Sequence, residues 1–529
     1  MSPFRPVFPL ASPRLSRRSF LGASSSMLVA LSAGRAWSNE PMVREKPSFQ
    51  AYPFQLGVAS GDPSADGFVL WTRLAPEPLA GGGMPREAVY VSWQVAEDEA
   101  MTKVVASGKE IASPDWAHSV HVEVTGLKPD RWYWYQFKAG AEISPPGRAR
   151  TLAGPGASLS ETSPLKMTFA SCQHFESGFY TAYQHMLAES PDLVFHLGDY
   201  IYEGSGRDGQ VRKHNSAEIM TLEDYRNRHA QYRSDPSLQA MHAAAPWVVT
   251  WDDHEVDNNY ANDIPEEKGP MEHEAFLRRR AAAYQAYYEH MPLRAACVPK
   301  GPGMKLYRSV RHGSLVDFHV LDTRQYRTDQ PNHDKNGPAS MDPNGTLMGG
   351  VQREWLFGEL KNSRAAWNVL AQQVMMARVS LSNGPGEMCS MDQWPGYEVE
   401  REALLRAFVD LKVSNPVVLT GDIHTHWANE LPVAPTQADA PIAATEFVCS
   451  SITSKGDGTD HPAGLERILS EHPFVKYHSD QRGYVSCVID AKSWRSDFRT
   501  VEYVSRPGAP LKTEASFVVE SGRVALNKA

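Results

Sequence analysis

Short apolar runs that end in acidic or histidine side chains recur along this 529-residue chain. The clearest run covers residues 193–197 and lies between Pro191 and Gly198, and the carboxylate of Asp199 follows directly after this glycine. Such a run is typical of a strand buried on both faces of a sheet. Three further runs share this design, at residues 165–174, 246–255 and 415–427. Because chemistry in open α/β sheets lies beyond the carboxyl ends of the strands, these four tips predict one shared site with several ligands.

Around these runs, strand-like segments alternate with segments of helical period. The clearest helix is predicted over residues 271–291, where Phe276, Ala283, Tyr287 and Met291 fall on one face. Further helices are predicted at 176–190, 351–361 and 400–411, and further strands at 315–322, 367–371, 483–490 and 498–504. This alternation is typical of an α/β domain built in layers, which we assign to residues 165–529.

Residues 45–153 follow the two-residue period of strands instead. Predicted strands lie at 69–72, 89–95 and 121–124. Residues 127–133 have the Leu-x-Pro-x-x-x-Tyr form of a tyrosine corner in a β-sandwich. We therefore expect a small all-β domain, similar to immunoglobulin or fibronectin type III domains, with a Gly-, Ser- and Pro-rich linker after it at 153–164. Trp132 and Trp134 fit a carbohydrate platform, but packing within the sheet is the commoner role of such residues.

The N-terminus has the pattern of an export signal. Arg17 and Arg18 form a twin-arginine motif, a mild apolar region follows at 27–31, and small residues lie around Ala36. We expect residues 1–38 to direct export by the twin-arginine translocation machinery, which places the mature protein in the periplasm or outside the cell. No later apolar stretch in the sequence is long enough to form a transmembrane helix.

The net charge of the chain limits which macromolecules can be its main binding partner. The formal net charge is −9, and residues 1–38 contain five Arg and no acid, so their removal lowers it by five to −14. This negative charge disfavours a nucleic-acid scaffold or an anionic membrane as the main partner.

Five Cys without close spacing exclude a dense disulfide framework. Cys172 lies among the strand-tip ligands and is the candidate for an unpaired thiol.

The strand tips supply a set of side chains suited to two metal ions, namely Cys172, Asp199, Tyr202, Asp253, Asp422 and His424. The carboxylate of Asp199 can bridge two ions. The thiolate of Cys172 and the phenolate of Tyr202 are strong anionic donors that favour ferric iron, whereas carboxylates favour a hard divalent ion such as calcium or manganese. Two ions about 3.5–4 Å apart clamp both oxygens of an in-line phosphoryl displacement, and one of them lowers the pKa of a bound water.

Four motifs resemble those of PhoD-type alkaline phosphatases: FASCQH at 169–174, GDYIYE at 198–203, TWDDHEVDNN at 250–259 and LTGDIHTHW at 419–427. Residues 54–74 resemble the start of the N-terminal domain of that family. More distantly, the order of the motifs is similar to that of calcineurin-like metallophosphoesterases and purple acid phosphatases. The resemblance implies an α/β catalytic domain with the metallophosphoesterase two-sheet sandwich and flanking helices.

The resemblance also implies roles for single residues. Ferric iron, Fe(3+), is expected at Cys172, Asp199, Tyr202 and His424, and calcium, Ca(2+), at Asp199, Asp253 and Asp422, with room for more than one calcium. Cys172 takes the place of the first Asp of the distant relatives, and Asp253 and Asp422 replace their Asn and His. Carboxylate oxygens are harder ligands than the side chains they replace, so they shift the preference of the second metal position from zinc toward calcium. His254 is expected to stabilise the transition state or to protonate the leaving oxygen without binding a metal.

Four further residues are candidates for roles at or beside the site. Arg324 either donates two hydrogen bonds to phosphate oxygens or forms a structural salt bridge with Asp322. Asn258 is an alternative calcium ligand, and Gln373 is placed to fill the slot of a further histidine in the distant relatives. His426 is interpreted as a structural residue beside the ligands.

The motifs predict a secreted alkaline phosphatase that cleaves phosphomonoesters and also phosphodiesters. Small phosphate esters are the expected substrates, with phospholipids or teichoic-acid-like diesters as larger ones. The alternative on the same site is a phospholipase D-like phosphodiesterase, because the loops around a site decide the size of the leaving group. Long polar loops are predicted to rim it at 204–213, 329–350, 382–396 and 454–463. A cell-wall-binding or adhesion protein with a degenerate second domain would have lost ligands at the tips, whereas all four tips keep theirs.

Overall fold

The computed structural model describes residues 43–160, 162–266, 271–382, 386–437, 439–462 and 464–529. All of these residues belong to one compact unit, Met42–Ala529. The predicted export signal at 1–38 lies outside the described residues. All five cysteines are buried thiols, in agreement with the exclusion of a dense disulfide framework. None of the described helices is both long and apolar enough to cross a membrane.

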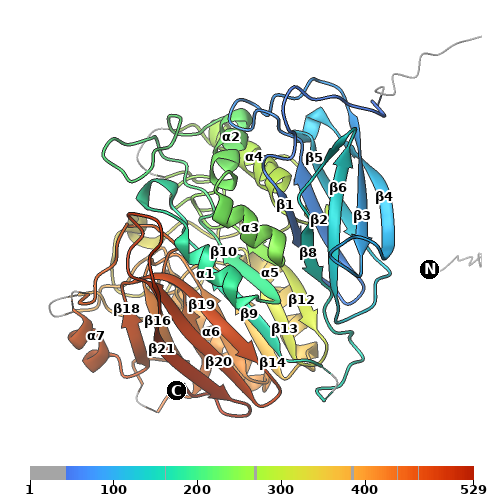
Figure 1. The fold of residues 1–529 in the computed structure, drawn as a ribbon. Helices are drawn as coiled ribbons and strands as arrows, with labels where there is room; N and C mark the ends of the chain where they lie inside the picture. Colours follow the sequence, from blue (N-terminus) through green and yellow to red (C-terminus); the bar gives the residue numbers. More distant parts are fainter. Residues whose placement is uncertain (1–42, 161, 267–270, 383–385, 438, 463) are drawn as a thin grey trace, which may run out of the picture. The chain divides into compact units, whose positions relative to one another are not determined.

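A ten-stranded mixed sheet forms one layer of the molecule (Figure 1). Its order is β22-β21-β20-β19-β9-β10-β11-β1-β2-β5, with these strands at Asn527–Lys528, Leu511–Glu520, Ser493–Val501, Arg482–Ile489, Leu165–Ala170, Leu193–Leu197, Pro246–Thr250, Val58–Gly61, Phe68–Arg73 and Ser119–Val124. The central strands β9, β10 and β11 are parallel neighbours. Because β10 and β11 are buried on both faces, they have the continuous apolar runs from which the sequence predicted them.

A seven-stranded sheet forms the second layer. Its order is β12-β13-β14-β15-β17-β16-β18, with these strands at Arg308–His312, Val316–Val320, Trp367–Ala371, Pro416–Thr420, Ile442–Val448, His426–Pro432 and Val475–Ser479. One apolar core contains side chains from both sheets, and the rings of Phe195 and Phe318 are 4.8 Å apart within it. The predicted two-sheet sandwich is therefore confirmed.

Helices cover the outer faces of the sandwich. They are α1 (Thr181–Glu189), α2 (Leu222–Arg233), α3 (Pro236–Ala244), α4 (His273–His290), α5 (Gly349–Asn362), α6 (Glu398–Asp410) and α7 (Leu465–Glu471). One core joins α1–α4 to the outward side chains of β10 and β11, such as Val194, and another joins α5 and α6 to those of β14 and β15. The four helices predicted from sequence correspond to α1, α4, α5 and α6. The helix expected from residue 176 begins at Thr181, because a 3₁₀ turn at Phe175–Ser177 and the extended Gly178 precede it.

The N-terminal region is all-β, as predicted, but it does not stand apart from the catalytic layers. A smaller sheet contains β4 (Val104–Ala112), β3 (Val89–Ala96), β6 (Trp132–Ala139), β7 (Glu142–Ile143) and β8 (Gly147–Arg150). It packs on β1, β2 and β5. These three strands belong to the ten-stranded sheet, which they join through the parallel pairing of β1 with β11. The phenol of Tyr133 bonds to both the N–H and the carbonyl of Lys128, which confirms the tyrosine corner. The domain boundary at residues 153–165 stays a prediction.

Candidate metal centre

Four of the proposed ligands lie in the left-handed region of backbone conformation. Their φ angles are 58° at Cys172, 56° at Asp199, 60° at Asp422 and 62° at His424. Each residue lies two or four positions after the end of β9, β10 or β15. A residue other than glycine pays about 1–3 kcal/mol for such a conformation, and such strain gathers at functional sites. The chain therefore turns sharply at each strand tip, where these side chains meet.

Two features bring the tips of β10 and β11 together. Gly198 has φ of 109°, and a Cβ at this position would lie 2.4 Å from the Cβ of Asp252, so the approach needs glycine. The buried carboxylate of Glu255 accepts hydrogen bonds from the backbone N–H groups of Asp199 (3.1 Å), Asp252 (2.8 Å) and Tyr200 (2.6 Å). Glu255 thus joins the two tips through their backbones.

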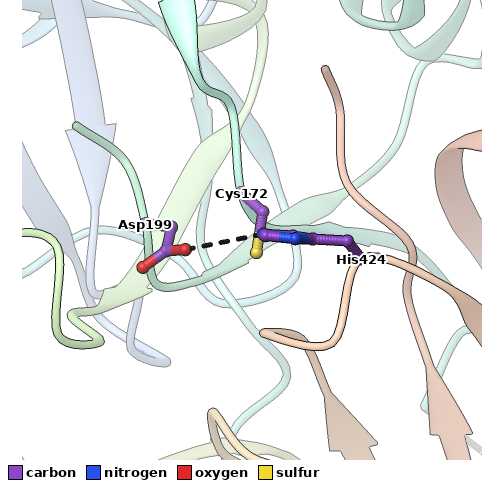
Figure 2. A group of neighbouring side chains, drawn as sticks. All are labelled: Cys172, Asp199 and His424. Carbon is purple, nitrogen blue, oxygen red and sulfur yellow. Dashed lines mark ion pairs between the residues drawn. The ribbon is translucent and has the colours of Figure 1, made fainter. Parts of the chain in front are cut away.

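A first group of donor atoms comes from three different strand tips. The ligand atoms of Cys172, Asp199 and His424 all lie within 4.8 Å of one another. Figure 2 shows the carboxylate of Asp199 and the ring of His424 directed toward each other beside the sulfur of Cys172. The Tyr202 hydroxyl lies 2.7 Å from Oδ2 of Asp199 and 3.2 Å from Nε2 of His424. The four residues assigned to iron from the sequence are thus brought together.

A second group of donor atoms adjoins the first. Asp252, Asp253 and Asp422 offer carboxylate oxygens within 4.8 Å of one another, and Asp253 also forms such a group with Asp199 and His254. The fully buried guanidinium of Arg324 lies beside them. It donates from Nε to Asp252 (2.5 Å) and from Nη1 to Asp392 (2.6 Å), and its Nη2 is 3.8 Å from oxygens of Asp253 and Asp422.

The charges of these groups favour a bound cation. Within the part of the chain that the structure describes, Oδ1 of Asp199, Oδ2 of Asp252 and Oδ1 of Asp253 are buried without a hydrogen-bond partner. Burial raises the pKa of Asp199 to about 7 and that of Asp422 to about 6. Burial also raises the pKa values of the Cys172 thiol and the Tyr202 phenol well above their ordinary range. Orphaned carboxylate oxygens among acids that resist ionisation fit multivalent cations, which would complete their coordination and stabilise their charge.

His254 is held in a different way from the proposed ligands. Its Nδ1 lies 2.7 Å from Oε2 of Glu203, whose other oxygen accepts the backbone N–H of Asn258 at 3.1 Å. Burial lowers the pKa of His254, but the carboxylates of Glu203, Asp253 and Asp199 raise it more, and the net shift is upward. These neighbouring carboxylates therefore favour the protonated form of the His254 imidazole.

Another cluster of potential ligands lies close by, at His174, Glu176 and His214. Nδ1 of His174 is 2.6 Å from Oγ of Ser177, and the two ring nitrogens of His214 lie 3.0 Å from the carbonyl of Gly204 and the Tyr232 hydroxyl. Glu176 accepts the backbone N–H groups of Arg207 and His214. Because these donors and acceptors already have partners, the cluster fits a clamp for the loop after β10 better than a metal site.

The further candidates from the sequence have different surroundings. The guanidinium of Arg324 pairs with Asp252 and Asp392, while the carboxylate of Asp322 accepts the backbone N–H of Arg324. The side chain of Asn258 bonds to Glu266, and Gln373 bonds to both Thr323 and Thr250 in the core. His426 accepts the backbone N–H of Ser450 and packs on Phe498, which is a structural arrangement.

Sequence reasoning missed Asp392, Gln393 and Ser454 as parts of the site. Asp392 binds Arg324 and Arg327, and Nε2 of Gln393 donates to Oδ2 of Asp422 at 3.1 Å. Ser454 lies 2.6 Å from the Tyr202 hydroxyl. The only sequence signal was that all three lie in the long polar loops predicted to rim the site.

Comparisons with known proteins match this arrangement to one family over most of the chain. Residues 167–498 match the model of the PhoD-like phosphatase, and residues 38–153 match the PhoD-like phosphatase N-terminal domain. The chain is 52% identical over 515 residues to alkaline phosphatase D of Bacillus subtilis (strain 168), covering 96% of this chain and 87% of that protein. A solved structure of PhoD superposes with a TM-score of 0.88 at 53% identity, covering 91% of this chain and 93% of that one.

Proposed function

Because this chain belongs to the PhoD-like phosphatase family, we propose that it is a metal-dependent alkaline phosphatase, a phosphoric ester hydrolase that acts on phosphomonoesters and phosphodiesters. The observation that carries the proposal is the convergence of Cys172, Asp199, Tyr202 and His424 beside two further buried aspartates, Asp252 and Asp253, that also have orphaned oxygens. Small phosphate esters are the proposed substrates, with phospholipids or teichoic-acid-like chains as larger diesters.

We assign ferric iron to the first group and calcium to the second. Thiolate and phenolate are donors suited to a trivalent ion at Cys172, Tyr202, His424 and Asp199. Asp253 and Asp422 provide only oxygen, which suits calcium. When bound, such a pair supplies the positive charge that draws in the phosphate and the acidity that ionises a water. Asp199 is the residue that we assign to both ions, through its carboxylate.

Residues of the chain itself supply the proton for the leaving oxygen and the positive charge that balances the buried carboxylates. Glu203 fixes Nδ1 of His254, which leaves Nε2 to deliver a proton to the leaving oxygen. Arg324 is buried and bound to carboxylates. We therefore interpret it as a counter-ion that positions Asp252 and Asp392, rather than as a residue that donates hydrogen bonds to the phosphate. The N-terminal twin-arginine pattern further supports export of a folded protein to the periplasm or beyond.

The role of His254 predicts a dependence on the leaving group. We expect His254→Ala to lower kcat/KM for an alkyl phosphate roughly 10²- to 10⁴-fold, because an alkoxide needs a proton as it leaves. For p-nitrophenyl phosphate we expect a much smaller loss, since p-nitrophenolate leaves without one. His185→Ala is the matched control, because His185 lies on α1 and its ring bonds to the carbonyl of Ala509. Equal losses for both substrates would exclude proton donation by His254.

Metal content tests the proposed function as a whole. We expect elemental analysis of the purified protein to find iron together with calcium, because the first group offers sulfur and phenol and the second only oxygen. Chelation should abolish hydrolysis of both p-nitrophenyl phosphate and bis(p-nitrophenyl) phosphate, and return of the two ions should restore it. Zinc as the dominant ion, or activity that survives complete removal of metal, would contradict the assignment.

A further inference from the structure

Residues 450–454, which we call the hydroxyl segment, bind the backbone beside the proposed ligands. The segment follows β17, and its side chains donate hydrogen bonds to carbonyl oxygens of residues in or next to the ligand-bearing tips. These bonds join Ser450 to His424 (2.9 Å), Thr453 to His174 (2.8 Å) and Ser454 to Cys172 (2.7 Å). The hydroxyl segment therefore connects the tip of β15 to the tip of β9, which belong to different sheets.

Ser454 differs from the other residues of the hydroxyl segment because its Oγ also reaches a proposed ligand atom. This oxygen lies 2.6 Å from the hydroxyl oxygen of Tyr202 and accepts the backbone N–H of His174 at 3.2 Å. Only 2% of Ser454 is exposed, so water does not compete for these bonds. One buried hydroxyl thus has three polar neighbours that belong to, or adjoin, the first metal group.

The direction of the hydrogen bond between Ser454 and Tyr202 depends on the protonation of Tyr202. A serine hydroxyl has one proton to donate, and two lone pairs that accept. The N–H of His174 occupies one lone pair, and the proton goes either to the carbonyl of Cys172 or to the oxygen of Tyr202. A neutral Tyr202 donates its own proton, for instance to Asp199 at 2.7 Å. An ionised Tyr202 has no proton, so in this pair Ser454 becomes the donor, and a hydrogen bond to a charged oxygen is about twice as strong as a neutral one.

We propose that Ser454 is a positioning residue of the metal centre, which holds the oxygen of Tyr202 in place and donates a hydrogen bond to it in its ionised form. The proposal rests on the proposed function, because it requires Tyr202 to be a ligand. A hydrogen bond to the phenolate withdraws electron density from its oxygen. With iron bound, Ser454 would therefore tune how strongly Tyr202 donates to it, and it would slow the loss of that iron by holding the phenolate oxygen in place and stabilising its negative charge against protonation.

The test compares Ser454→Ala with the matched control Thr453→Val in the full-length, metal-loaded protein. Both changes delete one hydroxyl bound to a backbone carbonyl, but only Ser454 touches the oxygen of Tyr202. The readout is the tyrosinate-to-iron charge-transfer band in the visible spectrum, which Tyr202→Phe should remove. We expect Ser454→Ala to shift this band to longer wavelength and to release iron to a chelator roughly tenfold faster. Thr453→Val should leave the band in place.

Ser454→Thr keeps the hydroxyl and should restore the wild-type band, which also covers the case in which the alanine variant does not fold. An unchanged band in Ser454→Ala, or an equal shift in Thr453→Val, would overturn the role of Ser454 and leave the proposed function standing. Absence of any charge-transfer band from wild-type protein that contains iron would instead refute tyrosinate ligation, and the role of Ser454 with it.

Discussion

Asp199→Asn should lower kcat/KM for p-nitrophenyl phosphate by at least about 10³-fold, which corresponds to about 4 kcal/mol of transition-state stabilisation. Asp199 lies close both to Cys172 and His424 of the first group and to Asp253 of the second, and its two oxygens face different neighbours. Oδ2 lies 2.7 Å from the Tyr202 hydroxyl, whereas Oδ1 is buried without a partner among the described residues. The amide retains one such oxygen, so the variant removes the bridge with the least change in shape.

Two measurements separate this loss from unfolding. The metal-free variant should be at least as stable as metal-free wild type, because it no longer buries a carboxylate that resists ionisation. Asp192→Asn is the matched control at the opposite end of β10, where Asp192 pairs with Arg150 and caps the backbone N–H of Lys166. We expect this control to keep its activity within about threefold, or about 0.7 kcal/mol. A similar loss in both variants would show that Asp199 acts through folding.

Arg324→Met should produce the largest loss of stability in the metal-free protein. Arg324 is fully buried, donates hydrogen bonds to Asp252 and Asp392, and lies 3.8 Å from Asp253 and Asp422. Breaking a buried ion pair leaves an uncompensated charge and typically costs 3–5 kcal/mol. We expect a loss of about this size in the free energy of unfolding, measured by urea denaturation of chelator-treated protein.

An exposed arginine supplies the comparison for this result. Arg311 pairs with Asp317 and Glu359, but 53% of its side chain is exposed, so solvent screens its charge. Arg311→Met should therefore change the stability by no more than about 1 kcal/mol. If Arg324→Met is equally mild, the aspartates do not depend on the guanidinium, and direct contact of Arg324 with phosphate becomes the better interpretation.

The central layers were predictable because their sequence signals are local. The strands β10 and β11 are continuous apolar runs, and carboxylates that we propose as ligands follow two or three positions after their ends. The long helix α4 repeats its apolar residues at helical spacing, so its predicted ends at 271 and 291 differ from the observed ones by only one or two residues. Local patterns of this kind also located the six proposed metal ligands.

Pairings between distant segments left no such signal. The four residues of β1 are too few to show a period, and nothing in them indicates that they pair with β11, nearly 190 residues later. Ser454 meets Tyr202 across 252 positions, and Arg324 meets Asp392 across 68. These contacts arise from the packing of the two sheets and from loop conformations, which the periodicity of a sequence does not encode. For that reason the sequence indicates the proposed ligands, but not the residues that hold them.

An anomalous-scattering map of the purified protein, recorded at the iron absorption edge, tests the central claim most directly. The account predicts one strong iron peak within bonding distance of Cys172, Asp199, Tyr202 and His424, beside a weaker calcium site at Asp253 and Asp422. An iron peak at His174, Glu176 and His214, or protein that contains iron elsewhere but none at the first group, would contradict it.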